Sequence, residues 1–202
     1  MTKRLVPVLL AMVPALALAQ ATTWNLDPVH TQTTFGVRHL VISTVRGEFK
    51  KTSGVVMLDE QDPTKSSVEA TIDATTINTR EDKRDADLKS PNFLDVQKYP
   101  TITFKSTKVV KDGDRYKVTG DLTIHGVTKP AVLDATLSPE VKDPWGGTRR
   151  GIQASTKINR QDYGLHYSKA IEAGPVVGDE VAIEINAEIV KAAGGQKAAS
   201  AR

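Results

Sequence analysis

The chain has 202 residues, of which 39% are hydrophobic and 25% charged, and its formal net charge is +3. This length and composition are typical of one globular domain and exclude fibrous and wholly disordered proteins. The sequence contains no cysteine, so a disulfide framework, a thiolate metal site and a cysteine nucleophile are excluded as well.

The N-terminal residues have the pattern of a cleaved export signal. Lys3 and Arg4 precede an apolar run at 5–18, and small residues occupy Ala17 and Ala19. A helix over this run would be about 21 Å long, which is shorter than a hydrocarbon core of about 30 Å. We therefore expect a signal peptide at 1–19, export to the periplasm or secretion, and a product that does not span the membrane.

The rest of the chain has nearly balanced charge. Residues 191–202 contain three basic residues and no acid, and their Ala, Gly, Ser and Lys content predicts a disordered basic tail. Between these two ends the chain is slightly acidic. Because nucleic-acid binding requires a concentrated positive surface, we exclude nucleic acid as a partner.

Period-two alternation of apolar and polar residues recurs along the chain and indicates half-buried antiparallel strands. Only one stretch, around residues 80–88, is dense in charge and poor in β-branched residues, and it predicts a short helix. The pattern predicts an all-β domain of eight or nine strands, and periodicity alone leaves a two-sheet sandwich and a closed barrel both open. The predicted strands lie within 33–37, 47–59, 66–75, 102–104, 116–124, 133–137, 152–158 and 181–189.

Residues with catalytic potential are few. The sequence has no GxSxG, GxGxxG, P-loop or HExxH motif, so it gives no local support for a hydrolase, a dinucleotide enzyme, a nucleotidase or a zinc protease. The four histidines have no ligand-like spacing, and we interpret them as polar residues at strand ends and turns rather than as metal ligands. We therefore predict no catalytic residue, no metal and no cofactor.

The charged stretch at 79–88 has two interpretations. It is either a solvated helix face with ion pairs such as Glu81 with Arg84, or a cap over one end of a barrel. In the second case Arg80 or Arg84 would offer a guanidinium to an anionic head group. The apolar strand faces likewise fit either a dry core or a lipid-filled interior.

Several blocks of the chain resemble the YceI family of lipid-binding, lipocalin-like bacterial proteins. They are WNLDPVH (24–30), FGVRHL (35–40), STVRGEF (43–49), RDADL (84–88), FLDVQKYPTITF (93–104), GDLTIHGVTKP (120–130) and INRQDYGL (158–165). The resemblance covers 22–190 in the family's order. It implies an extended eight-stranded antiparallel lipocalin-like β-barrel, with a short helix around 80–88, that encloses an elongated amphiphile.

On this basis we predict a non-enzymatic carrier of a polyisoprenoid, a polyprenyl pyrophosphate or an isoprenoid quinone. The predicted contacts of the lipid tail are Phe35, Val37, Phe104, Val118, Leu133, Ile152, Ile183 and Ile185. The predicted residues of the head group or the pocket mouth are His30, His39, Arg80 and Arg84.

Two alternatives differ in class. One is an enzyme that transforms a bound isoprenoid or quinone, with a histidine or Arg84 and Asp85 as acid and base. The other is a packed barrel without a cavity that binds a protein through its outer face. The sequence also leaves a homodimer open.

Overall fold

A computed structural model describes residues 21–167, 169–172 and 174–193. The predicted signal peptide and most of the predicted tail lie outside the described residues. The elements in chain order are β1 (Thr22–His39), β2 (Ser43–Phe49), β3 (Thr52–Leu58), η1 (Pro63–Lys65), β4 (Ser67–Asp73), η2 (Ala74–Thr76), β5 (Ile77–Asn78), α1 (Asp82–Lys89), β6 (Thr101–Asp112), β7 (Arg115–Ile124), β8 (Val127–Leu137), β9 (Val141–Lys142), β10 (Thr148–Asn159), η3 (Arg160–Tyr163), β11 (Ala170–Ile171), β12 (Gly174–Pro175) and β13 (Val177–Lys191).

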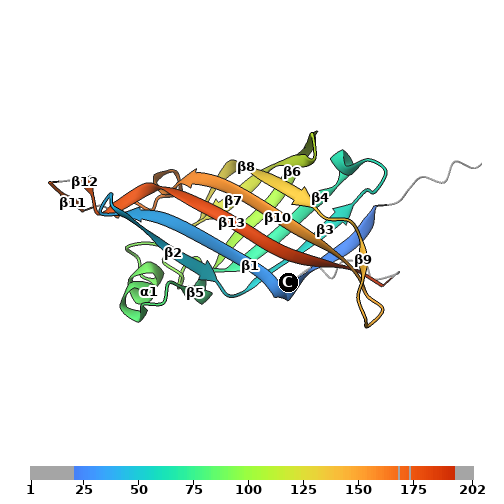
Figure 1. The fold of residues 1–202 in the computed structure, drawn as a ribbon. Helices are drawn as coiled ribbons and strands as arrows, with labels where there is room; N and C mark the ends of the chain where they lie inside the picture. The colour runs from blue at the N-terminus through green and yellow to red at the C-terminus, as the bar shows by residue number, and fades with distance from the viewer. Residues whose placement is uncertain (1–20, 168, 173, 194–202) are drawn as a thin grey trace, which may run out of the picture.

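The sheet closes into an antiparallel barrel (Figure 1), because β1 pairs with β13 as well as with β2 and β3. β2 pairs with the C-terminal half of β1 and β3 with its N-terminal half, so together they occupy one position in the barrel. With β1, β4, β6, β7, β8, β10 and β13, this shared position of β2 and β3 makes eight strand positions. The closed eight-stranded barrel is confirmed, and the strand predicted at 47–59 is interrupted between Phe49 and Thr52.

The predicted alternation decides which side chains face the interior. Phe35 of β1 and Ile183 of β13 are cross-strand partners, and both line the inside of the barrel. Their chain neighbours Thr34 and Glu184 are also partners, and they line a groove on the outer face. The period of two therefore separates an apolar inner surface from a polar outer one.

One end of the barrel is filled by side chains. Trp24 and Ile189 are fully buried there and pack with Val56 and Leu58. The Trp24 indole N–H donates to Thr22 Oγ1 at 2.8 Å, so its polar atom is satisfied. This packing closes one end of the barrel. β9 lies at that end (Figure 1).

The opposite end carries α1 and the β11–β12 hairpin (Figure 1). The helix begins after Glu81, whose side chain accepts the backbone N–H of Lys83 at 3.2 Å, and it confirms the predicted short helix within two residues at each end. Among the described residues no helix is both long and apolar enough to cross a bilayer.

Candidate functional site

The interior of the barrel contains a cavity of about 410 Å³. Its volume falls within the roughly 300–1,000 Å³ of typical small-molecule sites. The cavity contradicts the alternative of a packed barrel. All eight predicted tail-contact residues line it, namely Phe35, Val37, Phe104, Val118, Leu133, Ile152, Ile183 and Ile185.

The cavity is a blind tube with apolar walls. Ile152, Ala154, Thr156 and Ile158 follow one another along the inner face of β10 and all line it. At about 3.3 Å per residue these positions span about 20 Å along the strand. Ile152 also packs against the cluster around Trp24, so this cluster forms the floor of the tube.

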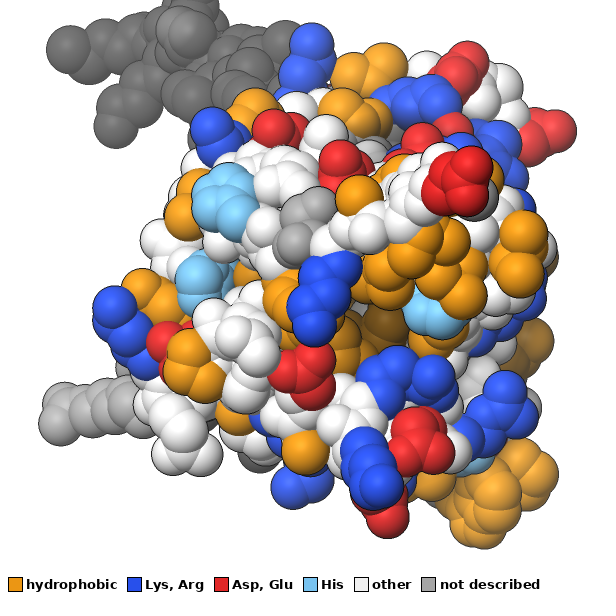
Figure 2. All heavy atoms as spheres, turned by 90° about the vertical axis from the view of Figure 1, so that its left-hand side faces the viewer, with side chains coloured by type: hydrophobic (Ala, Val, Ile, Leu, Met, Phe, Trp, Pro, Cys, Tyr) orange, Lys and Arg blue, Asp and Glu red, His pale blue; other side chains and the backbone are white. Residues whose placement is uncertain are grey.

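The other end of the tube is open. Figure 2 looks into this end and shows a hollow with hydrophobic side chains inside it and charged side chains of both signs and His side chains around it. The Phe93 and Tyr167 rings, with centroids 4.8 Å apart, join the segment after α1 to the segment before β11 beside the cavity. The titratable side chains among the described lining residues are Arg38, His39, Arg84, Asp87, Arg160 and Tyr167.

Arg84 is held at the cavity by Thr79. Its Nε donates to Thr79 Oγ1 at 2.7 Å and its Nη2 to the Thr79 carbonyl at 2.9 Å. Asp85 Oδ1 accepts both the Thr79 backbone N–H at 2.8 Å and the Thr79 hydroxyl at 2.5 Å. Asp85 is buried and does not line the cavity, so an acid–base pair of Arg84 and Asp85 would not reach a ligand inside it.

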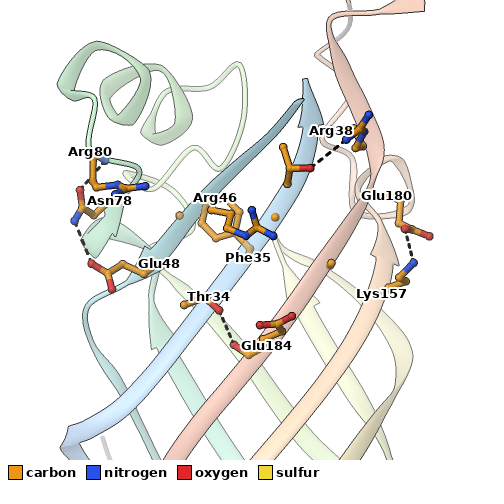
Figure 3. Close-up of a pocket in the computed structure, with 14 residues that line it drawn as sticks. Thr34, Phe35, Arg38, Arg46, Glu48, Asn78, Arg80, Lys157, Glu180 and Glu184 are labelled. Carbon is orange, nitrogen blue, oxygen red and sulfur yellow. Dashed lines mark hydrogen bonds and ion pairs between the residues drawn. The ribbon is translucent and has the colours of Figure 1, made fainter. Parts of the chain in front are cut away.

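Arg80 lies elsewhere, in a groove of about 570 Å³ on the outer face of the barrel (Figure 3). Its φ of +65° and the hydrogen bond from its N–H to Asn78 Oδ1 at 3.0 Å place it in a turn before α1. The groove crosses β13, β1 and β2, and its charges include the pair of Lys157 and Glu180 at 2.8 Å. The structure therefore brings His39 and Arg84 to the cavity, but not Arg80.

His30 also lies away from the cavity, in a bulge of β1 between Leu26 and Thr31. Its Nδ1 is 3.0 Å from Asp27 Oδ2 and 3.9 Å from Glu188 Oε2, which gives three groups that could ligate a metal. However, Arg149 Nη1 is 2.6 Å from the Asp27 carboxylate and 2.9 Å from that of Glu188. The arrangement is therefore an ion-pair network, and Arg149 together with His30 lowers the pKa of Asp27 well below its usual range.

Arg160 is a residue of the open end that sequence reasoning missed. The residue is 3% exposed, and its side chain donates to the carbonyls of Leu165, Val177 and Gly178. It also pairs with Asp179 at 2.8 Å. Arg160 thus fixes the segment after η3 against the start of β13, and the only signal in the sequence was its place in the block at 158–165.

Comparison with known proteins identifies the family. Residues 24–189 match the YceI-like domain. Protein YceI of Escherichia coli O6:H1 is 43% identical over 136 residues, which cover 67% of this chain and 71% of that protein. The chain belongs to the YceI family.

Solved structures of YceI-like proteins have the same barrel. The Campylobacter jejuni YceI protein superimposes with a TM-score of 0.67 at 32% identity, over 77% of this chain and 90% of that one. A polyisoprenoid binding domain from Saccharophagus degradans gives 0.62 at 17% identity, over 85% of this chain and 99% of that one. The second likeness shows the fold alone.

Proposed function

We propose that this YceI-family protein is a carrier that encloses a long isoprenoid-type amphiphile in the barrel for transport, storage or sequestration. Candidate ligands are a polyisoprenoid, a polyprenyl pyrophosphate and an isoprenoid quinone. The observation that carries the proposal is an apolar tube, closed at the Trp24 end, whose titratable lining groups include Arg84 and His39. The Saccharophagus degradans domain, described as binding polyisoprenoid, supports the ligand class by analogy.

Burial of the tail would supply most of the affinity. Each buried methylene contributes about 0.8 kcal/mol, so ten of them give about 8 kcal/mol before the costs of ordering the ligand. The tail enters first, because the apolar floor around Ile152 and Trp24 offers no partner to a polar head group.

Head-group selection falls to the open end. Arg84 uses Nε and Nη2 to bind Thr79, which leaves Nη1 to donate to a phosphate or a quinone carbonyl. His39 also lines the cavity. Arg84→Ala should therefore weaken binding of a polyprenyl phosphate much more than binding of the matching polyprenol, and equal weakening of both would contradict this role.

The alternative is an enzyme acting on the bound lipid. Catalysis requires an acid or base within hydrogen-bond reach of the reacting atom. Among the described lining residues, Asp87 has the carboxylate and His39 the imidazole that could act as acid or base. Asp87 Oδ1 already accepts a hydrogen bond from Asn92 Nδ2 at 2.9 Å. This favours carriage over catalysis. The N-terminal pattern at 1–19 supports a periplasmic site of action.

The decisive experiment is native mass spectrometry of protein purified from the periplasm without detergent, followed by extraction and identification of the bound compound. We expect one long-chain isoprenoid per barrel. The proposal would be refuted if the purified protein holds no lipid and takes up neither the polyprenol solanesol nor ubiquinone.

A matched pair of variants tests the location of the ligand. Ile183→Arg places a charge inside the tube and should abolish uptake of solanesol. Glu184→Arg changes the next residue, which faces the outer groove, and should leave uptake unchanged. Normal uptake by folded Ile183→Arg would show that the ligand does not occupy the tube.

A further inference from the structure

Two loops form a single projection at the open end of the barrel (Figure 1). They are the turn between β1 and β2 and the β11–β12 hairpin. The Leu40 N–H donates to the Val176 carbonyl at 2.9 Å. Gly174 lies directly against Val41, since a Cβ added to it would be 3.1 Å from Val41 Cγ2, and Ile171 is the cross-strand partner of Gly174.

Aliphatic side chains are exposed on this projection. Ile42 is 79% exposed, Val41 47% and Ile171 46%. We refer to these three residues as the mouth tip. A single exposed aliphatic residue is ordinary on a protein surface. Three of them on adjoining loops beside the entrance to an apolar cavity form a patch that indicates an interaction site.

The backbone of the turn makes this composition unusual. Leu40 and Val41 have φ values of +51° and +64°, and the Ile42 N–H donates to the His39 carbonyl at 3.2 Å, as in a type I′ hairpin turn. Asn-Gly is the favoured pair for such a turn, and a β-branched residue there is strained. Apolar side chains therefore stand where the backbone favours glycine.

We propose that the mouth tip inserts into the interfacial region of a lipid bilayer, so that a lipid passes between bilayer and cavity without crossing water. This inference rests on the proposed function. Tyr167 lines the cavity with the Lys169 ammonium 5.9 Å from its ring centroid, and an amphipathic aromatic beside a cation suits the boundary between lipid and water. With the mouth tip inserted, a lipid tail could pass from the bilayer directly into the adjoining apolar tube.

A protein partner fits this patch less well. Stable protein interfaces bury about 800 Å² on each side, and three aliphatic side chains provide only a small part of such an area. Shallow insertion into a bilayer has no such requirement, because its strength grows with each apolar side chain that enters the lipid.

The test is flotation of the protein with vesicles of phosphatidylethanolamine and phosphatidylglycerol. We expect the wild type to bind, and the double variant Ile42→Asp with Ile171→Asp to lose at least about tenfold in vesicle binding. The matched control is Val29→Asp with Val141→Asp, at side chains that are 82% and 57% exposed and do not line the cavity. It should bind vesicles like the wild type.

Two further measurements separate the causes of a loss. Val41→Gly removes an apolar side chain and relieves the positive φ, so it should weaken vesicle binding without lowering the unfolding midpoint. Each variant is also loaded with solanesol and weighed by native mass spectrometry. Failure of the wild type to load would refute the carrier function on which the insertion proposal rests, whereas loading without vesicle binding would refute insertion alone. A wild type that loads but does not float, or a mouth-tip variant that floats normally, overturns the proposal. The proposal is also overturned if the mouth-tip variant binds vesicles like the wild type and loses only its self-association in solution.

Discussion

Ala154→Leu probes the cavity inside the barrel through its effect on stability. Ala154 of β10 and Ala135 of β8 are cross-strand partners, and both line the tube. In a fully packed interior a larger side chain at this position would force its neighbours apart. In an empty tube it would instead gain contacts, so we expect the substitution to stabilise the lipid-free protein.

The size of the effect follows from the added atoms. Leucine brings three more carbons than alanine, and each is worth about 0.8 kcal/mol when buried, which gives an upper value of about 2.4 kcal/mol. Because the new side chain would contact the wall on one side only, we expect a gain of about 1–2 kcal/mol. Overpacking would instead cost about 1–3 kcal/mol. An empty tube and a packed interior therefore predict opposite signs for the change in the free energy of unfolding.

The assay is urea unfolding of delipidated protein, in which a raised midpoint at constant slope reports higher stability. Binding of solanesol should weaken in the same variant, because leucine occupies part of the tube. The control is Ala182→Leu, the same substitution on the outer face of β13, and it should change stability by less than about 0.5 kcal/mol. A lower midpoint for Ala154→Leu beside a neutral Ala182→Leu would refute the cavity.

Three other predictions concern the open end, the ion-pair network and the floor. Arg160→Ala should destabilise the protein by about 2–4 kcal/mol in urea unfolding, because it removes the donor to the buried Leu165 carbonyl and to two half-buried carbonyls. Asp179→Asn, at the half-exposed partner, should cost much less. The pKa of Asp27 is lower in the folded protein than the ordinary aspartate value of about 3.9. The ion pair therefore stabilises the fold at pH values above about 3.9, and this stabilisation is lost as the pH falls further. Asp27→Asn should therefore lower stability at pH 7 and flatten its decline between about pH 4 and pH 2, and an unchanged decline would contradict this. Ile152→Ala should deepen the tube and shift competition between polyprenols toward the longer chain, measured by native mass spectrometry, and Ile158→Ala further along β10 should not.

The sequence predicted the strands and their inner faces because one physical cause determines both. A strand with one buried face must alternate, so Ile152 to Ile158 and Val181 to Ile185 could be assigned to the interior without any structure. The alternation alone could not decide between a closed barrel and a two-sheet sandwich. Closure depends on the pairing of β1 with β13, and pairing between the two ends of a chain leaves no local pattern.

Polar residues were harder to place because their position depends on local irregularities. The bulge of β1 carries His30 into the network around Arg149, and the positive φ of Arg80 carries that residue out to the groove. Neither irregularity is visible in the spacing of the residues. Arg160 was missed for a related reason. A single arginine in a sequence is expected to be exposed, and the carbonyls that bind this one are known only from the structure.

The two ends of the tube differ in a way that gives the cavity a direction. At one end Trp24 and Ile189 exclude solvent completely, and Arg150 and Lys191 lie over the Trp24 ring with their charges 5.8 and 5.2 Å from its centroid. A ligand cannot leave by this end without opening the hydrophobic cluster. At the other end the groups beside the cavity are arginines, a histidine, the Asp87 carboxylate and an aromatic pair. An amphiphile can therefore occupy the tube in one orientation only, with its polar end at the same opening through which it must enter and leave.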